Sequence, residues 1–241
     1  MPHTRTAPDE ADHIAAARAA VVAAALPHVV FDGWSDRTLA MAVEDAGVDA
    51  DLARLAFPRG GVDLALAYHR MKDAEFARRL AAEDLTGLRF RDRVAHAIAL
   101  RLELIAADRE AVRRAAALFA LPPYAADGAR AIWGTADAIW TALGDESRDY
   151  NWYTKRTTLS AVYSSALLYW LGDDTPGFAR TREFIHRRID NVMSFEEAKA
   201  RIAKNPLAAA LLKGPQRILG RVRAPGEAAA DLPGRWREGP R

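Results

Sequence analysis

The chain has 241 residues, half of which are hydrophobic, and it contains no cysteine. This length can bury a sizeable core, and the absence of cysteine excludes disulfides, thiolate metal sites and cysteine nucleophiles. The formal net charge of +2 is uneven, because the segment 198–226 holds seven basic and no acidic residues, which leaves −5 on the remainder. An acidic body followed by a basic segment predicts that the segment contacts an anionic surface.

The composition predicts an all-α protein. Alanine and leucine are abundant, and β-branched residues form few runs. No apolar run approaches the roughly 20 residues that span a bilayer. Residues 1–13 lack the apolar core of a signal peptide and contain acidic residues that transit peptides avoid, so we expect a cytoplasmic protein.

Helix-breaking residues divide the first 60 positions into three units. A first helix is expected from about Asp9 to Val30, with a kink or an end at Pro27. A short helix over 36–45, a tight turn at Gly47 and a second short helix over 49–56 follow. This pattern is that of a helix-turn-helix and resembles the N-terminal domain of TetR-type regulators.

The residues of the second short helix argue against DNA binding. Recognition helices offer basic, amide or hydroxyl side chains to bases and phosphates. Here Asp49 and Asp51 lead the helix, and Arg54 is its one base. Two carboxylates would repel phosphates, so we expect no binding of nucleic acid.

Six further helices and no strand are expected downstream. Apolar residues at three- and four-residue spacing predict helices over 62–85, 90–106, 109–121, 124–143, about 149–171 and 176–192. With the three N-terminal helices, the sequence predicts about nine core helices.

The stretch Gly144 to Leu171 concentrates four of the six tyrosines and two of the six tryptophans. Its polar start supplies caps for a long helix that ends at a glycine. Trp152 and Tyr153 are adjacent in the first turn, so they point about a hundred degrees apart and do not both face one core. Either they wedge two helices of the core, or they form an exposed aromatic and basic patch with Lys155 and Arg156 that anchors a protein partner.

Catalytic motifs are missing from the sequence. The six histidines are scattered, and the Glu183–His186 pair is one ExxH motif where di-iron bundles need two and two further glutamates. No phosphate loop, nucleophile elbow or HExxH is found. The residues therefore predict a helical binding protein that is not an enzyme and has no cofactor or metal.

Residues 194–223 read as a separate basic amphipathic unit. A segment of this kind can lie in the plane of an anionic membrane with its apolar face down, although a solvated or dimer-packing tail is an equal alternative. Pro206 and Pro215 exclude one straight helix. The predicted membrane-binding residues are Leu211, Leu212, Lys213, Arg217, Ile218, Leu219 and Arg221.

The string GDESRDYNWYTKRTTLSAVYSSALLYWLGDDT closely resembles the signature of a coenzyme Q (ubiquinone) biosynthesis family, the ninth of the numbered proteins of that pathway, known from mitochondria and α-proteobacteria. The matching positions are Gly144, Asp145, Ser147, Asp149, Asn151 to Arg156, Leu159, Tyr163, Tyr169 to Leu171 and Asp173. An upstream pattern also fits, at Gly33, Trp34, Ala46, Gly47, Phe57, Pro58 and Asp63, so the resemblance covers about residues 10–195.

The resemblance implies a TetR-like helical bundle in which the helix-turn-helix-like subdomain has lost DNA binding and the C-terminal helical domain holds an isoprenoid quinone or precursor lipid. It also implies an accessory role in ubiquinone biosynthesis, in which the protein presents this ligand to the di-iron demethoxyubiquinone hydroxylase. Peripheral attachment to the inner face of the membrane and a homodimer, common for this fold, are expected with it.

On this interpretation two sets of residues form the sites. The predicted partner-binding residues are Asp149, Asn151, Trp152, Tyr153, Lys155 and Arg156. The predicted lipid-binding residues, chosen by apolar face alone, are Ile98, Leu102, Leu118, Trp133, Ile139, Leu159, Tyr163 and Leu167. Two alternatives stay open: a TetR-type ligand-responsive transcriptional regulator, and a structural adaptor with the partner patch but no lipid cavity.

The expected domain organisation has five parts. They are a disordered lead at 1–8, the helix-turn-helix-like subdomain at 9–62, the helical lipid-binding domain at 63–193, the membrane-associating segment at 194–223 and a disordered tail at 224–241.

Overall fold

The computed structural model describes residues 7–203, with side chains described for residues 12–194. The described part contains nine α-helices and two short 3-10 helices and no strand, which confirms the predicted all-α fold. The α-helices are α1 (Ala7–Asp32), α2 (Asp36–Asp45), α3 (Ala50–Ala56), α4 (Gly61–Ala81), α5 (Phe90–Glu103), α6 (Arg109–Phe119), α7 (Ala125–Ala142), α8 (Tyr150–Leu171) and α9 (Ala179–Ala203). The 3-10 helices are η1 (Pro122–Tyr124) and η2 (Pro176–Phe178).

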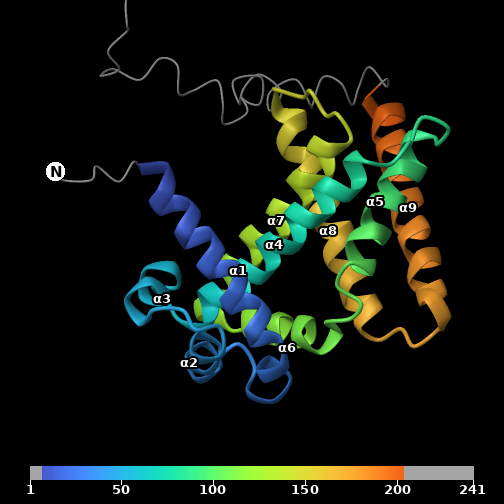
Figure 1. The fold of residues 1–241 in the computed structure, drawn as a ribbon. Helices are drawn as coiled ribbons and strands as arrows, with labels where there is room; N and C mark the ends of the chain where they lie inside the picture. The colour runs from blue at the N-terminus through green and yellow to red at the C-terminus, as the bar shows by residue number, and fades with distance from the viewer. Residues whose placement is uncertain (1–6, 204–241) are drawn as a thin grey trace, which may run out of the picture.

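The helices form two groups that share one hydrophobic core. In Figure 1, α1, α2 and α3 gather on one side, α5 and α9 run along the other, and α4 and α7 cross between them. The helix α8 packs against α7 and α9. The helix-turn-helix-like unit and the larger helical domain are thus joined through α1, which contacts both α4 and α6.

Helix α1 continues through Pro27 to Asp32, where the sequence predicted a kink or an end. A proline inside a helix costs about 3 kcal/mol through its lost N–H and its ring clash. Val22 and Ala25 precede this proline and Val29 follows it, and all three are fully buried. Packing on both sides of Pro27 therefore outweighs the cost of the proline.

The helix α1 is also more apolar than expected. Among the described residues, Asp12–Asp32 is the one stretch long and apolar enough to cross a membrane by length and composition, with a mean hydropathy of 1.8. The sequence prediction that no run approaches spanning length is therefore wrong here. Because α1 packs on α2, α3, α4 and α6, we interpret its buried residues Val21, Val22, Ala25 and Val29 as core, whereas Val30 and Phe31 of the same helix are exposed.

The helix-turn-helix-like unit forms at the predicted positions. The Ser35 hydroxyl caps α2 by accepting from the Thr38 amide at 3.1 Å, and the Asp49 carboxylate caps α3. Gly47 has a φ of +60° in the turn between them. On α3, Asp51 is ion-paired with Arg54, so the base of this helix is already engaged within the chain.

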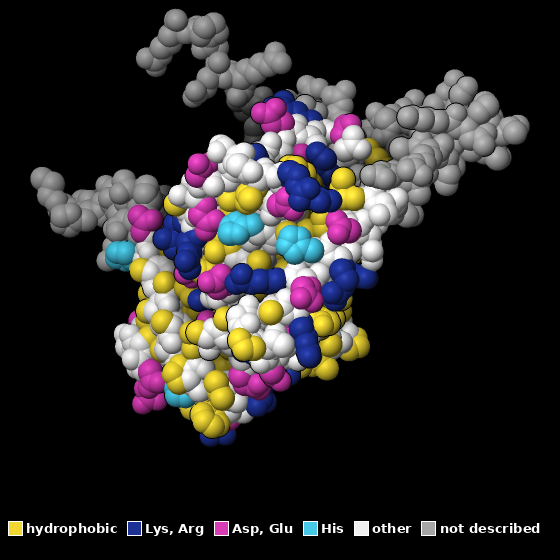
Figure 2. All heavy atoms as spheres, turned by 90° about the vertical axis from the view of Figure 1, so that its right-hand side faces the viewer, with side chains coloured by type: hydrophobic (Ala, Val, Ile, Leu, Met, Phe, Trp, Pro, Cys, Tyr) yellow, Lys and Arg dark blue, Asp and Glu magenta, His cyan; other side chains and the backbone are white. Residues whose placement is uncertain are grey.

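The face formed by α5 and α9 carries charges of both signs. Figure 2 shows basic and acidic side chains interspersed on this side of the molecule, with hydrophobic side chains between them. Arg91 of α5 pairs with Asp190 of α9 at 3.6 Å, while Ile185 and Ile189 are buried beneath. The first part of α9 is therefore a core helix.

The predicted boundary at residue 194 falls inside α9, which runs without a break to Ala203. The last helix is longer than the predicted 176–192 because no glycine or proline interrupts the chain between Ala179 and Ala203. The predicted disordered lead at 1–8 is too long, because Ala7 and Pro8 already belong to α1. Residues 1–6 of that lead, the tail at 224–241 and the membrane-binding residues Leu211, Leu212, Lys213, Arg217, Ile218, Leu219 and Arg221 lie outside the described residues.

Candidate functional site

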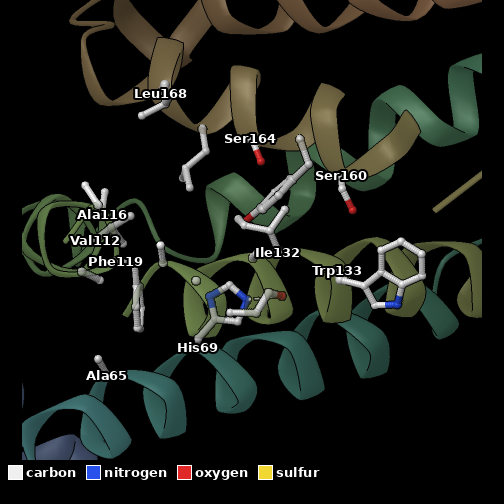
Figure 3. A pocket seen from close by; sticks show the side chains of 18 of the residues that line it. Ala65, His69, Val112, Ala116, Phe119, Ile132, Trp133, Ser160, Ser164 and Leu168 are labelled. Carbon is white, nitrogen blue, oxygen red and sulfur yellow. Dashed lines mark hydrogen bonds between the residues drawn. The ribbon is translucent and has the colours of Figure 1, made fainter. Parts of the chain in front are cut away.

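A cavity of about 540 Å³ lies in the larger helical domain. Its walls come from α4, α6, α7 and α8, with Arg101 and Ile105 closing it from the α5 side. In Figure 3, Ser160 and Ser164 reach down from α8, while Ala65 and His69 lie on α4 opposite. Leu168 is 65% exposed and also lines the cavity, so the cavity opens to the surface along α8.

Short side chains create the cavity. Its lining residues with small side chains are Ala65, Ala115, Ala116, Ala120, Ala125, Gly128, Ala129, Ala131 and Ala161. Protein interiors are ordinarily filled to the density of organic crystals, so a wall of alanines and a glycine leaves a void that longer side chains would fill. At 540 Å³ the cavity falls within the roughly 300–1,000 Å³ of small-molecule sites.

Gly128 sets the closest approach of α6 and α7. A Cβ atom at this position would lie 2.6 Å from the Cβ of Phe119, which itself lines the cavity. Any larger residue would push α6 from α7 or displace the Phe119 ring. The glycine therefore holds one wall of the cavity in place.

The cavity has a polar floor. Asp73 accepts hydrogen bonds from Arg101 Nε at 2.8 Å and from Thr135 Oγ1 at 3.0 Å. His69 Nε2 lies 2.8 Å from Thr135 Oγ1 and 3.1 Å from the Ala131 carbonyl oxygen. Because a carbonyl oxygen only accepts, His69 Nε2 carries the hydrogen. These hydrogen bonds join α4, α5 and α7 under the cavity.

In the polar floor, Arg101 and Asp73 form an ion pair. Burial alone would raise the pKa of Asp73, but the hydrogen bond from His69 and the nearby Arg101 guanidinium lower it below the ordinary value. Burial also raises the pKa of Tyr68 and of Tyr163, both of which line the cavity. Their hydroxyl groups therefore stay protonated near neutral pH.

A second polar cluster lies at the start of α8. Asp145 accepts from Lys155 Nζ at 2.7 Å, from Ser147 Oγ at 2.7 Å and from Arg156 Nη1 at 3.0 Å. Arg156 also donates from Nε to Asp137 Oδ1 at 2.6 Å. Burial opposes ionisation of Asp145, but its hydrogen bonds from Lys155, Ser147 and Arg156 lower its pKa to about 2. This cluster fixes the loop before α8 onto α7.

Three aromatic side chains pack together beside Arg156 of this polar cluster. Trp152 and Tyr153 meet edge to face with ring centroids 4.8 Å apart, and Trp133 of α7 lies 5.8 Å from Trp152. The Arg156 guanidinium lies 4.0 Å above the Trp152 ring, a cation–π contact. We call Trp133, Trp152 and Tyr153 the aromatic cluster; all three are half-buried.

The structure separates the predicted partner-binding residues. Asp149 and Asn151 are exposed, and Asp149 caps α8 through the Asn151 amide at 3.0 Å. The expectation of an exposed Arg156 is wrong, because this residue is 2% exposed. Its two carboxylate partners and the Trp152 face draw the guanidinium inward, so Arg156 positions the aromatic cluster from beneath.

The predicted lipid-binding residues are divided as well. Trp133, Tyr163 and Leu167 line the cavity. Ile98, Leu102, Leu118, Ile139 and Leu159 lie elsewhere, buried in or packed on the hydrophobic core. The prediction selected large apolar residues, and most of these fill the core. The wall of the cavity consists largely of residues with small side chains. The run AAALFALPPYAADGARA at 115–131 was the signal that could have identified the wall.

Among residues 7–203, no group of three or more histidine, cysteine, aspartate or glutamate side chains is arranged to hold a metal ion. Glu183 of the ExxH motif pairs with Arg187 at 3.8 Å, and His186 is exposed on α9.

The fold and the site together define a TetR-like helical protein with an apolar cavity. A solved structure with this architecture is the TetR transcriptional regulator from Nitrosomonas europaea, with a TM-score of 0.56 and 19% identity over 72% of this chain and 95% of that one. At this identity the likeness concerns the fold alone, and it confirms the predicted TetR-like bundle.

Sequence comparison then shows which family the chain resembles. The COQ9 family profile matches residues 125–196, from the start of α7 into α9. The chain is 29% identical over 185 residues to the mitochondrial ubiquinone biosynthesis protein COQ9 of Drosophila melanogaster, covering 75% of this chain and 56% of that protein. It is 26% identical over 181 residues to the human protein of the same name, with 72% and 57% covered.

The same relationship extends to fission yeast, where the mitochondrial coq9 protein is 26% identical over 193 residues, covering 79% of this chain and 75% of that protein. The chain thus spans just over half the length of the fly and human relatives. These comparisons confirm the resemblance to the ubiquinone biosynthesis family that the α8 signature indicated.

Proposed function

We propose that the chain is a non-catalytic accessory protein of ubiquinone biosynthesis. It binds an isoprenoid quinone intermediate in the cavity beneath α8 and presents the ring to the di-iron demethoxyubiquinone hydroxylase. The names of the fly and human relatives support the pathway, and the apolar cavity supports a lipid ligand. Each isoprene unit taken from a bilayer needs apolar cover, because exposing it to water costs about 25 cal/mol per Å².

One observation carries the proposal: the cavity and the aromatic cluster share a residue. Trp133 lines the cavity and also contacts Trp152 and Tyr153. Thr157 and Ser160, which follow Tyr153 by about one and two turns along α8, line the cavity too. A partner that docks on the cluster therefore lies next to the ligand, so a lipid has a short path from one protein to the other.

The aromatic cluster has the chemistry of a docking site. Half-exposed tryptophan and tyrosine side chains are enriched among residues that dominate protein interfaces. The buried Arg156 holds the Trp152 ring from below, so the cluster loses little conformational freedom when a partner binds. Lys155, which is paired with Asp145, supplies a positive charge at the rim.

The membrane is the source of the ligand in this proposal. An isoprenoid quinone resides in the bilayer, so the protein has to reach the bilayer surface to collect it. The basic segment at 194–223 would provide that contact through Lys213, Arg217 and Arg221 beside apolar residues.

The regulator alternative is less well supported. Its DNA-binding helix would be α3, where Asp49 serves as the cap and Arg54 is ion-paired with Asp51. Together these residues give the start of α3 a net negative charge, which opposes the attraction to phosphates that supplies most of the affinity for DNA.

Co-purification with the hydroxylase tests the proposal. Trp152→Ala combined with Tyr153→Ala removes two of the three rings, and we expect it to abolish capture of the purified hydroxylase. Tyr169→Ala is the matched control, because it removes an aromatic ring near the other end of α8, where Tyr169 stacks on Phe184. Capture that survives the double substitution would overturn the docking role of the cluster.

A further inference from the structure

Arg101 is buried at the floor of the cavity and is incompletely bonded. Its side chain is 1% exposed, yet it lines the cavity. Nε donates to Asp73 at 2.8 Å and Nη2 reaches the His69 carbonyl oxygen at 3.5 Å, while Nη1 is buried without a partner. Folded proteins rarely leave a buried charged donor unpaired, because its lost hydration is not replaced.

The neighbouring groups fix the orientation of this guanidinium. Asp73 is held by Arg101, by Thr135 Oγ1 and by His69 Nε2, the last at 3.3 Å. With its carboxylate partner anchored on α4 and Thr135 anchored on α7, the planar guanidinium has little freedom to turn Nη1 toward another acceptor. The unpartnered donor is therefore a fixed feature of the floor.

The charge of the floor selects the kind of acceptor. Arg101 and Asp73 form an ion pair, and the lowered pKa of Asp73 keeps this carboxyl ionised, so the pair is neutral overall. A ligand carboxylate or phosphate would add an uncompensated negative charge inside an apolar cavity, which is unfavourable. A neutral oxygen, such as a quinone carbonyl, accepts from Nη1 without that penalty.

The rest of the cavity fits an apolar tail. Ser160 Oγ is a further buried polar atom without a partner among the lining residues. Alanine, phenylalanine and leucine side chains form most of the remaining wall, out to Leu168 at the surface. A few polar atoms in a largely apolar wall suit an amphiphile with an oxygenated ring and a hydrocarbon chain.

We propose that Arg101 is a specificity-determining residue, which donates from Nη1 to a neutral ring oxygen of the bound amphiphile. The ligand lies with its oxygenated ring at the Arg101 floor and its hydrocarbon chain along the alanine wall. This inference rests on the proposed lipid function and adds the group that distinguishes a quinone from other apolar molecules.

Probes that differ in their oxygens test this proposal. The full chain is incubated with phosphatidylcholine vesicles loaded with decylubiquinone, decylbenzene or dodecanoate, separated from the vesicles, and extracted to measure the probe retained per protein. Arg101→Lys keeps the positive charge beside Asp73 but removes the guanidinium fork. We expect it to lower retention of decylubiquinone about tenfold and to change retention of decylbenzene less than twofold.

Arg109→Lys is the matched control. Arg109 is a partly buried arginine that donates to the carbonyl oxygens of Trp170 and Leu171 and lies outside the cavity lining. Arg109→Lys should leave the retention of decylubiquinone and of decylbenzene as in the wild-type protein. If Arg101→Lys fails to fold, wild-type protein with ¹⁵N-labelled arginine replaces it: decylubiquinone should shift one arginine side-chain resonance, and decylbenzene none.

The possible results distinguish a failure of the role proposed for Arg101 from a failure of lipid binding itself. Equal losses of decylubiquinone and decylbenzene in Arg101→Lys would make Arg101 structural and overturn the inference alone. Unchanged retention of both would do the same. Preferential, Arg101-dependent retention of dodecanoate would overturn the neutral acceptor. Wild-type protein that retains none of the probes would overturn the lipid function itself.

Discussion

Two buried arginines show how differently this chain treats the same side chain. Arg156, at the start of α8, is 2% exposed and has two carboxylate partners and the Trp152 ring. Arg101, at the cavity floor, is 1% exposed and has one carboxylate partner and an unpartnered Nη1. The Arg156 guanidinium finds its partners within the chain and supports the aromatic cluster at the surface. The Arg101 guanidinium keeps one donor without a partner, at the cavity where a ligand can accept from it.

The largest expected effect comes from removing Arg156. Arg156→Met leaves Asp137 and Asp145 without their shared partner, and Asp145 is almost fully buried. Breaking a buried ion pair in this way costs about 3–5 kcal/mol. We expect about 3 kcal/mol because Lys155 remains on Asp145, measured as the loss in free energy of urea unfolding. A loss below about 1 kcal/mol would show that the cluster is not structural.

A smaller effect is expected at the cavity wall. Gly128→Ala places a Cβ against Phe119, and overpacking of this kind costs about 1–3 kcal/mol. Gly134→Ala is the control on the same helix, since nothing lies within 4 Å of its Cβ position, and it should be neutral or stabilising by up to about 1 kcal/mol. Thermal melting compares the two. Equal melting temperatures would mean that α6 and α7 move apart freely.

The smallest effect depends on pH. Asp145 has a pKa of about 2 in the folded protein, below its unfolded value, so its ionised form stabilises the fold above the unfolded pKa. This contribution is lost as pH falls toward 2. Asp145→Asn should therefore be destabilised by about 1–2 kcal/mol at pH 7, with a difference that shrinks between pH 4 and pH 2. A difference that is constant over this range would contradict the ionic role of Asp145.

The sequence predicted the positions of the helices well because the helix ends carry their own signals. Asp49 and Asp149 cap α3 and α8 through their own side chains, and the Phe57–Pro58 pair ends α3. These are local effects that the neighbouring residues determine. Pro27 and the end of α9 were less predictable, because burial of Val29 and the absence of a stop signal extend those helices.

The candidate site was harder to predict. The aromatic stretch in α8 was visible, but the burial of Arg156 depends on Asp137 of α7, 19 positions away. The floor joins His69, Asp73, Arg101 and Thr135 from three helices, and no spacing in the sequence relates them. A cavity is a space between helices, so alanines and a glycine mark its wall better than the large apolar residues do.

The most direct measurement is native mass spectrometry of the purified protein, with organic extraction to identify any bound lipid. We expect one isoprenoid quinone or precursor per chain, displaced by added decylubiquinone. A protein that carries no lipid, and that takes up no quinone from vesicles, would contradict the central claim and leave the aromatic cluster as the docking site of a structural adaptor.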